Sequence, residues 1–106
     1  MTSSIGRVFG GSKSSFPYSF GKASGEFIPV ELKELGACNV LTNIVRIGAT
    51  DTKRFRTLGK DVAERADLVP LKRLARAEEI ARYLFWISSP DNGFIHNQIL
   101  AVSGGE

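Results

Sequence analysis

The feature of this chain that most limits its possible folds is the alternation of helical and strand patterns along a short sequence. Residues 39–45 are mostly apolar and β-branched, which predicts a strand buried on both faces. A helical pattern precedes this strand over residues 15–35, and another follows it over residues 77–87. A second short strand is predicted over residues 98–102. This order predicts an α/β protein with a parallel sheet.

The two predicted helices differ in regularity. In residues 77–87 one wide apolar stripe is formed by Ile80, Leu84 and Ile87, with Ala81 and Phe85 beside them. The earlier pattern, over residues 15–35, contains Gly25 and Pro29, and a proline inside a helix removes one hydrogen bond. We therefore expect a kink there, within an otherwise continuous helix.

Two other segments are predicted to lack long regular elements. Residues 1–14 are rich in serine and glycine and read as a loop. Residues 49–74 join the first strand to the last helix, and their central part, residues 53–68, is amphipathic but irregular. That pattern predicts one or two short helices in a mobile lid, which Val69-Pro70-Leu71 ends.

Charge and composition exclude several classes of function. The net charge of the 106 residues is +3, but basic and acidic residues alternate, and the densest basic stretch, residues 53–56, is too short for a nucleic-acid-binding arm. No apolar stretch approaches the roughly 20 residues that span a bilayer, and no secretory leader pattern is visible. We expect a cytoplasmic setting, no metal site, and Cys38 as a small packed residue.

The chemistry-bearing pattern is Tyr18-Ser19-Phe20-Gly21-Lys22. On a helix, residues four apart share one face, so the phenol and the ammonium can converge. A neighbouring cation favours the phenolate, which makes a phenol a usable proton donor or acceptor near neutral pH. Such a group could protonate a carbonyl oxygen as hydride reaches its carbon. Taken alone, the spacing is more often that of two surface residues on a helix.

Further motifs occur around this pair in a definite order. They are Ser3-Ser4-Ile5, Tyr18-x-x-x-Lys22, Asn43-x-Val45-x-x-Gly48-x-x-x-Thr52, Pro70-Leu71-Lys72-Arg73-Leu74, Glu78-Glu79-Ile80-Ala81 and Phe94-Ile95-x-x-Gln98-x-Leu100-x-Val102-x-Gly104-Gly105. Together they resemble the short-chain dehydrogenase/reductase family. The amino-acid sequences of residues 39–43 and 102–105 look most like those of bacterial 3-oxoacyl-acyl-carrier-protein reductases. The resemblance implies that residues 1–106 are the C-terminal, catalytic part of a doubly wound, Rossmann-type parallel-sheet domain.

The resemblance also implies roles for single residues. Tyr18 would be the general acid/base, Lys22 would stabilise its phenolate and hold the nicotinamide ribose, and Ser4 would hydrogen-bond the substrate carbonyl or hydroxyl. Gly48 would let the backbone approach the nicotinamide. Thr50, through its backbone, and Thr52 would lie near the carboxamide, completing a site with Tyr18 and Lys22 for NAD or NADP, of which NADP is favoured. The substrate would be a ketone or secondary alcohol, and a homo-oligomer would form through the long helices.

The sequence also departs from the family pattern. The glycine-rich turn that seats a pyrophosphate belongs to the N-terminal half of such domains, and we expect that half to be absent here. The remaining two parallel strands would form a poor sheet alone, so we expect no nucleotide affinity and no turnover from residues 1–106 in isolation. Ile47 stands where the family usually has proline, and His96-Asn97 replaces the usual Thr-Gly.

Other interpretations stay open beside this one. His96 is the only histidine and is expected to be a solvated loop residue, not a ligand or catalyst. Tyr83 and Trp86 are expected to be core or interface residues. A non-enzymatic alternative is a truncated paralogue acting as a dimerisation or interaction module through exposed apolar faces. A basic nucleic-acid-binding module is a third possibility, supported only by the isoelectric point of about 9.3.

Overall fold

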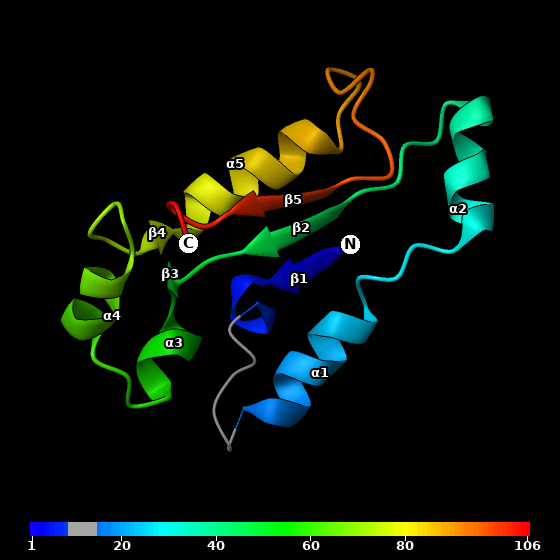
Figure 1. Ribbon diagram of the computed structural model, residues 1–106. Coiled ribbons are helices and arrows are strands. Elements are labelled where there is room, and N and C mark those ends of the chain that lie inside the picture. The colour runs from blue at the N-terminus through cyan, green and yellow to red at the C-terminus, as the bar shows by residue number, and fades with distance from the viewer. Residues whose placement is uncertain (9–14) are drawn as a thin grey trace.

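A three-stranded parallel sheet forms the centre of the molecule. The computed structural model describes residues 1–8 and 15–106, and its main sheet has the order β1-β2-β5 (Figure 1). The strands are β1 (Thr2–Ser4), β2 (Ile44–Ile47) and β5 (Ile99–Val102). Ser4 is in register with Ile47, and Ile47 with Val102, so all three strands end at the same edge. The α/β class with a parallel sheet is thus confirmed.

The first strand corrects the prediction of a loop over residues 1–14. Thr2–Ser4 pairs with β2, so the sheet has three strands where two were expected. Its serine-rich sequence hides the strand because the inward residue, Ser3, is buried by a polar contact and not by an apolar one. A short 3₁₀ helix, η1 (Ile5–Arg7), follows directly. Residues 9–14 lie outside the described part of the chain.

The strand predicted over residues 39–45 begins later, at Ile44. Asn39 has a left-handed backbone with a φ of 59°, which interrupts any extended segment there. The side chain of Asn43 donates to the Ile95 carbonyl at 2.7 Å and accepts from the Gln98 amide at 3.1 Å, as loop residues do. Ile44 and Val45 are buried on opposite faces of the sheet, and together with Ile5 they belong to the buried apolar residues.

The single helix predicted over residues 15–35 is wrong. The segment folds as α1 (Phe16–Ser24), α2 (Val30–Glu34) and a 3₁₀ turn, η2 (Leu35–Cys38). Pro29 caps the start of α2 with a φ of −57° and an extended ψ of 149°, so the first helix ends before the proline instead of bending at it. Cys38, expected to be packed, is exposed at the end of η2.

The segment between the sheet strands contains two short helices, as predicted. They are α3 (Lys53–Thr57) and α4 (Val62–Leu68). Two short strands, β3 (Thr50–Asp51) and β4 (Ala75–Arg76), flank the pair and form a second, parallel sheet that the sequence did not reveal. Val69 follows α4 and is buried, and the Leu71 amide donates to the Gly104 carbonyl at 3.2 Å.

The last helix, α5 (Ala77–Ile87), has the predicted bounds. Ile80 and Ile87 are buried, whereas the Phe85 side chain is 78% exposed. The buried stripe is therefore narrower than predicted. Among the described residues, no helix is both long and apolar enough to cross a membrane.

Candidate active site

The candidate site lies at the carboxyl edge of the main sheet. Ser4 is the last residue of β1, and Gly48 comes directly after the last residue of β2. Because β1 and β2 are parallel and Ser4 pairs with Ile47, both candidate residues reach the same edge. In open α/β sheets, ligands bind outside the carboxyl ends of the strands. The sheet therefore places two of the predicted residues where ligands of such folds bind.

Helix α1 brings the predicted acid/base pair to β1. The Lys22 ammonium lies 5.9 Å from the centroid of the Tyr18 ring, as the i, i+4 spacing predicts. Lys22 Nζ also donates to the Thr2 carbonyl at 3.3 Å, so the ammonium is held against β1. Tyr18 is 56% exposed, and its phenol is accessible to a substrate. An ammonium has three donors, so two remain on Lys22 for a ligand.

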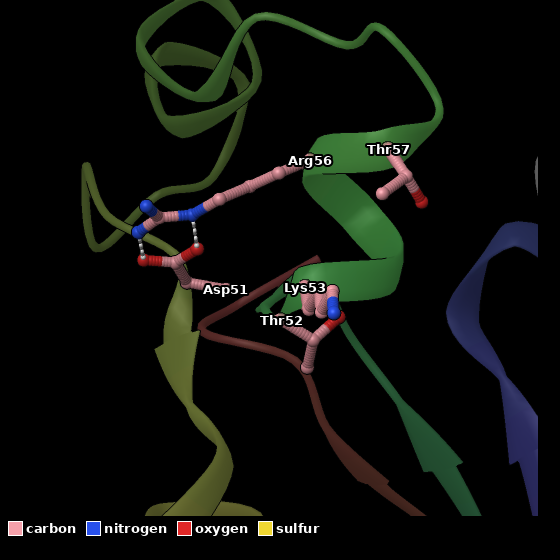
Figure 2. Close-up of a pocket in the computed structure, with 5 residues that line it drawn as sticks. All are labelled: Asp51, Thr52, Lys53, Arg56 and Thr57. Carbon is pink, nitrogen blue, oxygen red and sulfur yellow. Dashed lines mark hydrogen bonds and ion pairs between the residues drawn. The ribbon is translucent and has the colours of Figure 1, made fainter.

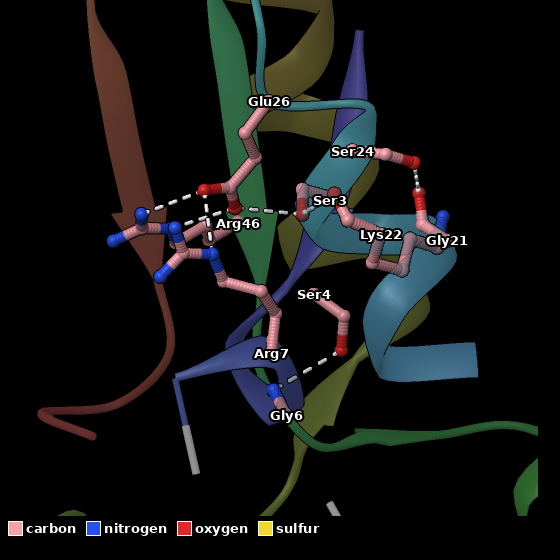
Figure 3. A network of polar contacts seen from close by, with 9 residues as sticks. All are labelled: Ser3, Ser4, Gly6, Arg7, Gly21, Lys22, Ser24, Glu26 and Arg46. Carbon is pink, nitrogen blue, oxygen red and sulfur yellow. Dashed lines mark hydrogen bonds and ion pairs between the residues drawn. The ribbon is translucent and has the colours of Figure 1, made fainter. Parts of the chain in front are cut away.

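The Ser4 hydroxyl has a structural role of its own. It caps η1 by accepting a hydrogen bond from the Gly6 amide at 3.2 Å (Figure 3). A hydroxyl that accepts through one lone pair still carries a hydrogen to donate. The cap fixes the position of Ser4 Oγ at the end of β1, and the O–H can still be directed at a substrate oxygen.

Gly48 is demanded by packing. Its amide donates to the Val102 carbonyl at 2.9 Å, and a Cβ atom at position 48 would lie 2.5 Å from the Cα atom of Ser103. The backbones of Gly48 and Ser103, which directly follow β2 and β5, are thus in contact. Thr50 Oγ1 donates to the Gly48 carbonyl at 3.1 Å and braces the turn that follows. The predicted role of Gly48 beside a nicotinamide is compatible with this packing but is not needed to explain it.

Thr52 borders an open, shallow cavity of about 500 Å³, which is lined by Asp51, Thr52, Lys53, Arg56 and Thr57 (Figure 2). Its Oγ1 accepts from the Phe55 amide at 3.1 Å and caps α3. Asp51 and Arg56 form a two-bond ion pair at 2.6 and 2.8 Å. The hydrogen bond from Arg56 lowers the pKa of Asp51, so this carboxylate stays ionised.

Sequence reasoning missed a buried charge cluster next to the site (Figure 3). Glu26 accepts two hydrogen bonds from Arg46, at 2.8 and 2.7 Å, and one from Ser3 at 2.8 Å. Arg7 Nε lies 2.9 Å from the same carboxylate. Hydrogen bonds from Arg46 are the main cause that lowers the pKa of Glu26 to about 2. The cluster ties the segment after α1 to β1, η1 and β2, the elements that carry Lys22, Ser4 and Gly48.

One signal could have revealed this cluster. Arg46 is a lone charge within the apolar run from Ile44 to Ile47, and a charge on a buried strand needs an opposite charge nearby. The partner could not be named from the sequence, because Glu26 is one of several carboxylates between α1 and η2.

His96 is not the solvated loop residue that we expected. Its Nδ1 accepts from the Thr42 amide at 2.9 Å, and its Nε2 lies 2.7 Å from the Lys33 carbonyl. Because Nδ1 accepts from Thr42, Nε2 is the ring nitrogen that can donate to the Lys33 carbonyl. His96 therefore joins the end of α2 to the loop before β2. Among the described residues, no group of three or more His, Cys, Asp or Glu side chains is placed to hold a metal ion.

Tyr83 and Trp86 lie together on α5, with ring centroids 5.9 Å apart. Trp86 is 40% exposed and Tyr83 is half-buried, so neither belongs to the fully buried core. Both remain available for an interface.

Comparison with known proteins assigns the chain to a group of reductases. A family model described as "Enoyl-(Acyl carrier protein) reductase" matches residues 2–106. An uncharacterised oxidoreductase, YmfI of Bacillus subtilis, is 38% identical over 92 residues, which cover 83% of this chain and 37% of that protein. The 3-oxoacyl-[acyl-carrier-protein] reductase FabG of Chlamydia trachomatis is 34% identical over 74 residues, covering 69% of this chain and 30% of that protein. The chain thus spans about a third of the length of these relatives.

The fold is also found among solved structures. A blue fluorescent protein from a metagenomic library, whose structure was determined in complex with NADPH, superposes with a TM-score of 0.79 at 22% identity. The superposition covers 98% of this chain and 42% of that one. At this identity the likeness shows the fold alone.

Proposed function

The chain belongs to the short-chain dehydrogenase/reductase family, and from this premise we propose that it is the catalytic part of an NAD(P)-dependent oxidoreductase acting on a ketone or secondary alcohol. The observation that carries the proposal is the placement of Tyr18 and Lys22. Their helix packs against β1, Lys22 bonds to that strand, and Ser4 ends it. These contacts support a site in which the Tyr18 phenol, the Lys22 ammonium and the Ser4 hydroxyl act together at the edge where α/β sheets bind ligands.

The residues divide the work of carbonyl reduction. When bound, a nicotinamide supplies the hydride that attacks the carbonyl carbon. Tyr18 transfers its phenolic proton to the carbonyl oxygen, which becomes the hydroxyl of the alcohol product. Lys22 stabilises the phenolate that remains, and Ser4 donates a hydrogen bond to the same oxygen and orients it. In the reverse direction Tyr18, as the phenolate, accepts the proton of the alcohol.

The described residues fit a nicotinamide ribose and carboxamide. Lys22 has two donors beyond its bond to Thr2, and these suit ribose hydroxyls. Thr52 Oγ1 accepts from Phe55 and keeps its hydrogen for a ligand at the cavity wall. Gly48 and the backbone of Thr50 would face the ring. NADP is the favoured form, because a protein of the same fold was solved with NADPH. The substrate is proposed to be a 3-oxoacyl thioester, as the name of the Chlamydia relative says of that protein.

The test is a graft into a relative with a known type of activity. Residues 1–106 would replace the matching segment of the Chlamydia trachomatis reductase, and NADPH oxidation would be followed with an acetoacetyl thioester. We expect turnover, and we expect Tyr18→Phe to lower kcat/KM by about 10²- to 10⁴-fold, the contribution of general acid/base catalysis. Tyr83→Phe, on α5, is the matched control and should leave kcat/KM unchanged.

Two results would refute the proposal. One is a folded graft that is inactive; the other is a Tyr18→Phe graft that is as active as its parent. Because the matching family model is described as an enoyl reductase, a crotonyl thioester should be assayed in parallel. Faster reduction of the crotonyl carbon–carbon double bond than of the acetoacetyl ketone would move the activity to that class.

A second candidate function is a dimerisation or interaction module without catalysis. It is favoured by the exposure of large apolar side chains, namely Phe16, Phe20, Phe27, Phe85 and Phe94. Exposed apolar patches mark interaction sites, and among these residues Phe16 and Phe20 stack on each other with ring centroids 6.0 Å apart. Size-exclusion chromatography with light scattering measures the mass of the folded chain in solution. A folded monomer would count against this second candidate.

A further inference from the structure

The segment after β5, residues 103–106, contacts both the sheet edge and the predicted lid. The Cα atom of Ser103 lies 2.5 Å from where a Cβ atom at Gly48 would stand, so the segment packs on a proposed nicotinamide contact. It also packs on the end of the lid, because a Cβ atom at Gly104 would lie 2.7 Å from Val69 Cγ1. The segment lies at the arrowhead of β5, at the same edge of the sheet as α3 and α4 (Figure 1). A movement of the lid therefore reaches the proposed site through these residues.

Charge, and not apolar burial, fastens α4 to this segment. None of the residues of α4 is buried. Arg65, on α4, forms an ion pair with Glu106, and the two side chains are 22% and 5% exposed. Ser103 Oγ donates to the Glu106 carbonyl at 3.0 Å, which holds the backbone of that residue in place. Within the described residues α4 forms no other ion pair, so its position at the sheet edge depends on this pair of charges.

The Arg65–Glu106 pair is incompletely hydrogen-bonded. Arg65 Nη1 and Glu106 Oε2 are both buried, and neither forms a hydrogen bond in the part of the chain that the structure describes. A buried ion pair with an unmet donor and acceptor contributes little beyond what it costs to remove its charges from water. The attached and detached positions of α4 are therefore close in free energy, as the two states of a lid must be.

The other half of the lid is attached more completely. Asp51 and Arg56, which join β3 to α3, form two hydrogen bonds at 2.8 and 2.6 Å. Between the two helices, Gly59 has a φ of 66°, and a Cβ atom there would meet no atom within 4 Å. Hinges are loop residues that can absorb changes in backbone angle. Gly59 therefore allows α4 to move while α3 stays attached to the second sheet.

We propose that Glu106 is a positioning residue for the proposed reaction: through Arg65 it holds α4 at the sheet edge, and release of this pair lets α4 move away about Gly59. The inference rests on the proposed function, because it assigns the movement of α4 to the entry and retention of that substrate. Closure of a lid excludes water from a site. When only a fraction of the molecules is closed, the apparent affinity falls by that fraction. Loss of the pair therefore raises KM and leaves kcat nearly unchanged.

Amide exchange, measured by NMR on the whole chain without nicotinamide or substrate, tests the attachment of α4. We expect Glu106→Gln to speed the exchange of residues 62–68 at least about fivefold relative to α5, because an unpaired Arg65 favours the detached position. Arg65→Gln should act alike, and Arg65→Gln/Glu106→Gln should exchange no faster than either single variant, since all remove the same interaction. Glu64→Gln removes an exposed carboxylate of α4 that no described cation pairs with. It is the matched control and should exchange as the parent does.

Kinetics of the Chlamydia trachomatis graft test the effect on the substrate, with NADPH saturating and the acetoacetyl thioester varied. We expect Glu106→Gln to raise KM about three- to tenfold and to change kcat by less than about twofold. A general loss of folded enzyme would lower kcat and leave KM unchanged, so this split separates positioning from stability. Glu64→Gln should alter neither constant.

Several results would overturn the proposed role of Glu106. They are unchanged exchange in Glu106→Gln, additive effects of the two substitutions, an equal effect of Glu64→Gln, and a graft in which Glu106→Gln lowers kcat at constant KM. An inactive parent graft would refute the proposed function instead, and the exchange data would still decide whether Glu106 holds α4. An active parent graft with unaltered exchange would overturn the role of Glu106 alone.

Discussion

Glu26 shows how one side chain can join the parts of a site that it does not itself enter. Its side chain is 3% exposed and accepts bonds from Ser3 and from Arg46, on two different strands. Removing one member of a buried charge cluster leaves the others uncompensated, which costs more than the cluster contributes in total. The carboxylate therefore matters for the relative positions of α1, β1 and β2.

We expect Glu26→Gln to destabilise the chain by about 2 kcal/mol, below the full value for a buried pair because Arg46 is partly exposed. The pKa of Glu26 is about 2 in the folded chain and 4.5 ordinarily. A lowered pKa stabilises the fold fully above pH 4.5, and this stability is lost as the pH falls towards 2. Urea unfolding of both forms, from pH 7 to pH 2, measures the effect.

The difference in the free energy of unfolding between the parent and Glu26→Gln should shrink as the pH falls from 4.5 towards 2. Glu79, whose pKa Arg73 also lowers to about 2, titrates in both forms and so cancels from the comparison. Glu31→Gln, an exposed carboxylate on α2, is the matched control and should behave as the parent. A constant difference between Glu26→Gln and the parent down to pH 2 would contradict the prediction.

Gly48 gives a second prediction at the scale of single residues. We expect Gly48→Ala to cost about 1–3 kcal/mol, because the new methyl group would meet the Ser103 backbone at 2.5 Å. Gly21→Ala is the matched control: no atom lies within 4 Å of a Cβ there, and alanine favours the helix by about 0.5–1 kcal/mol. Thermal unfolding should move the two midpoints in opposite directions, and a shift in the same direction would refute the packing argument.

At the scale of elements, regular patterns predicted structure where burial is apolar and failed where it is polar. Residues 77–87 form α5 as expected, because Ile80 and Ile87 repeat at helical spacing and are both buried. β1 was missed because its inward residue is Ser3, whose burial depends on Glu26, a partner distant in sequence. The pairing of β3 with β4 was missed for a different reason: strands of two residues are too short to show a hydrophobic period.

In the candidate site, too, local contacts could be predicted from the sequence, whereas contacts between distant segments could not. The sequence could predict the Tyr18–Lys22 pair, because helical spacing is local and the two groups are four residues apart. It could not predict that Lys22 bonds to the Thr2 carbonyl, or that Arg46 reaches Glu26, because those contacts depend on how α1 lies on the sheet. Placement of Gly48 at the same edge as Ser4 likewise required the register of β1 with β2.

His96 supports a prediction about the α2–η2 segment. Its ring bonds to the Thr42 amide and the Lys33 carbonyl, and no other side chain of the described residues bonds to either group. We expect His96→Ala to destabilise the chain by about 1–2 kcal/mol and to speed amide exchange in residues 30–42. Gln98→Ala, which removes only an exposed bond to the His96 carbonyl, should leave that exchange unchanged. Unaltered exchange in His96→Ala would contradict this role.

At the scale of the whole molecule, the proposed function places the reaction at the sheet edge and leaves open which residues hold the rest of the nucleotide. Among the described residues no glycine-rich turn joins a strand to a helix, the arrangement that holds a pyrophosphate. We therefore expect residues 1–106 alone to show no measurable NADPH binding by fluorescence titration. The graft into the Chlamydia trachomatis reductase is the positive control. Saturable binding by the isolated chain would contradict the prediction and would place more of the cofactor site within these residues.

The contact between Gly48 and Ser103 has a consequence for descent. Selection for a folded sheet alone is enough to keep glycine at position 48, since any larger residue forces β2 and β5 apart. The exposed phenol of Tyr18 is under no comparable steric requirement. In a lineage that ceased to reduce carbonyls, Tyr18 would be free to drift long before Gly48. Gly48 would then be retained because the fold requires it, whereas Tyr18 would be retained only under selection for carbonyl reduction.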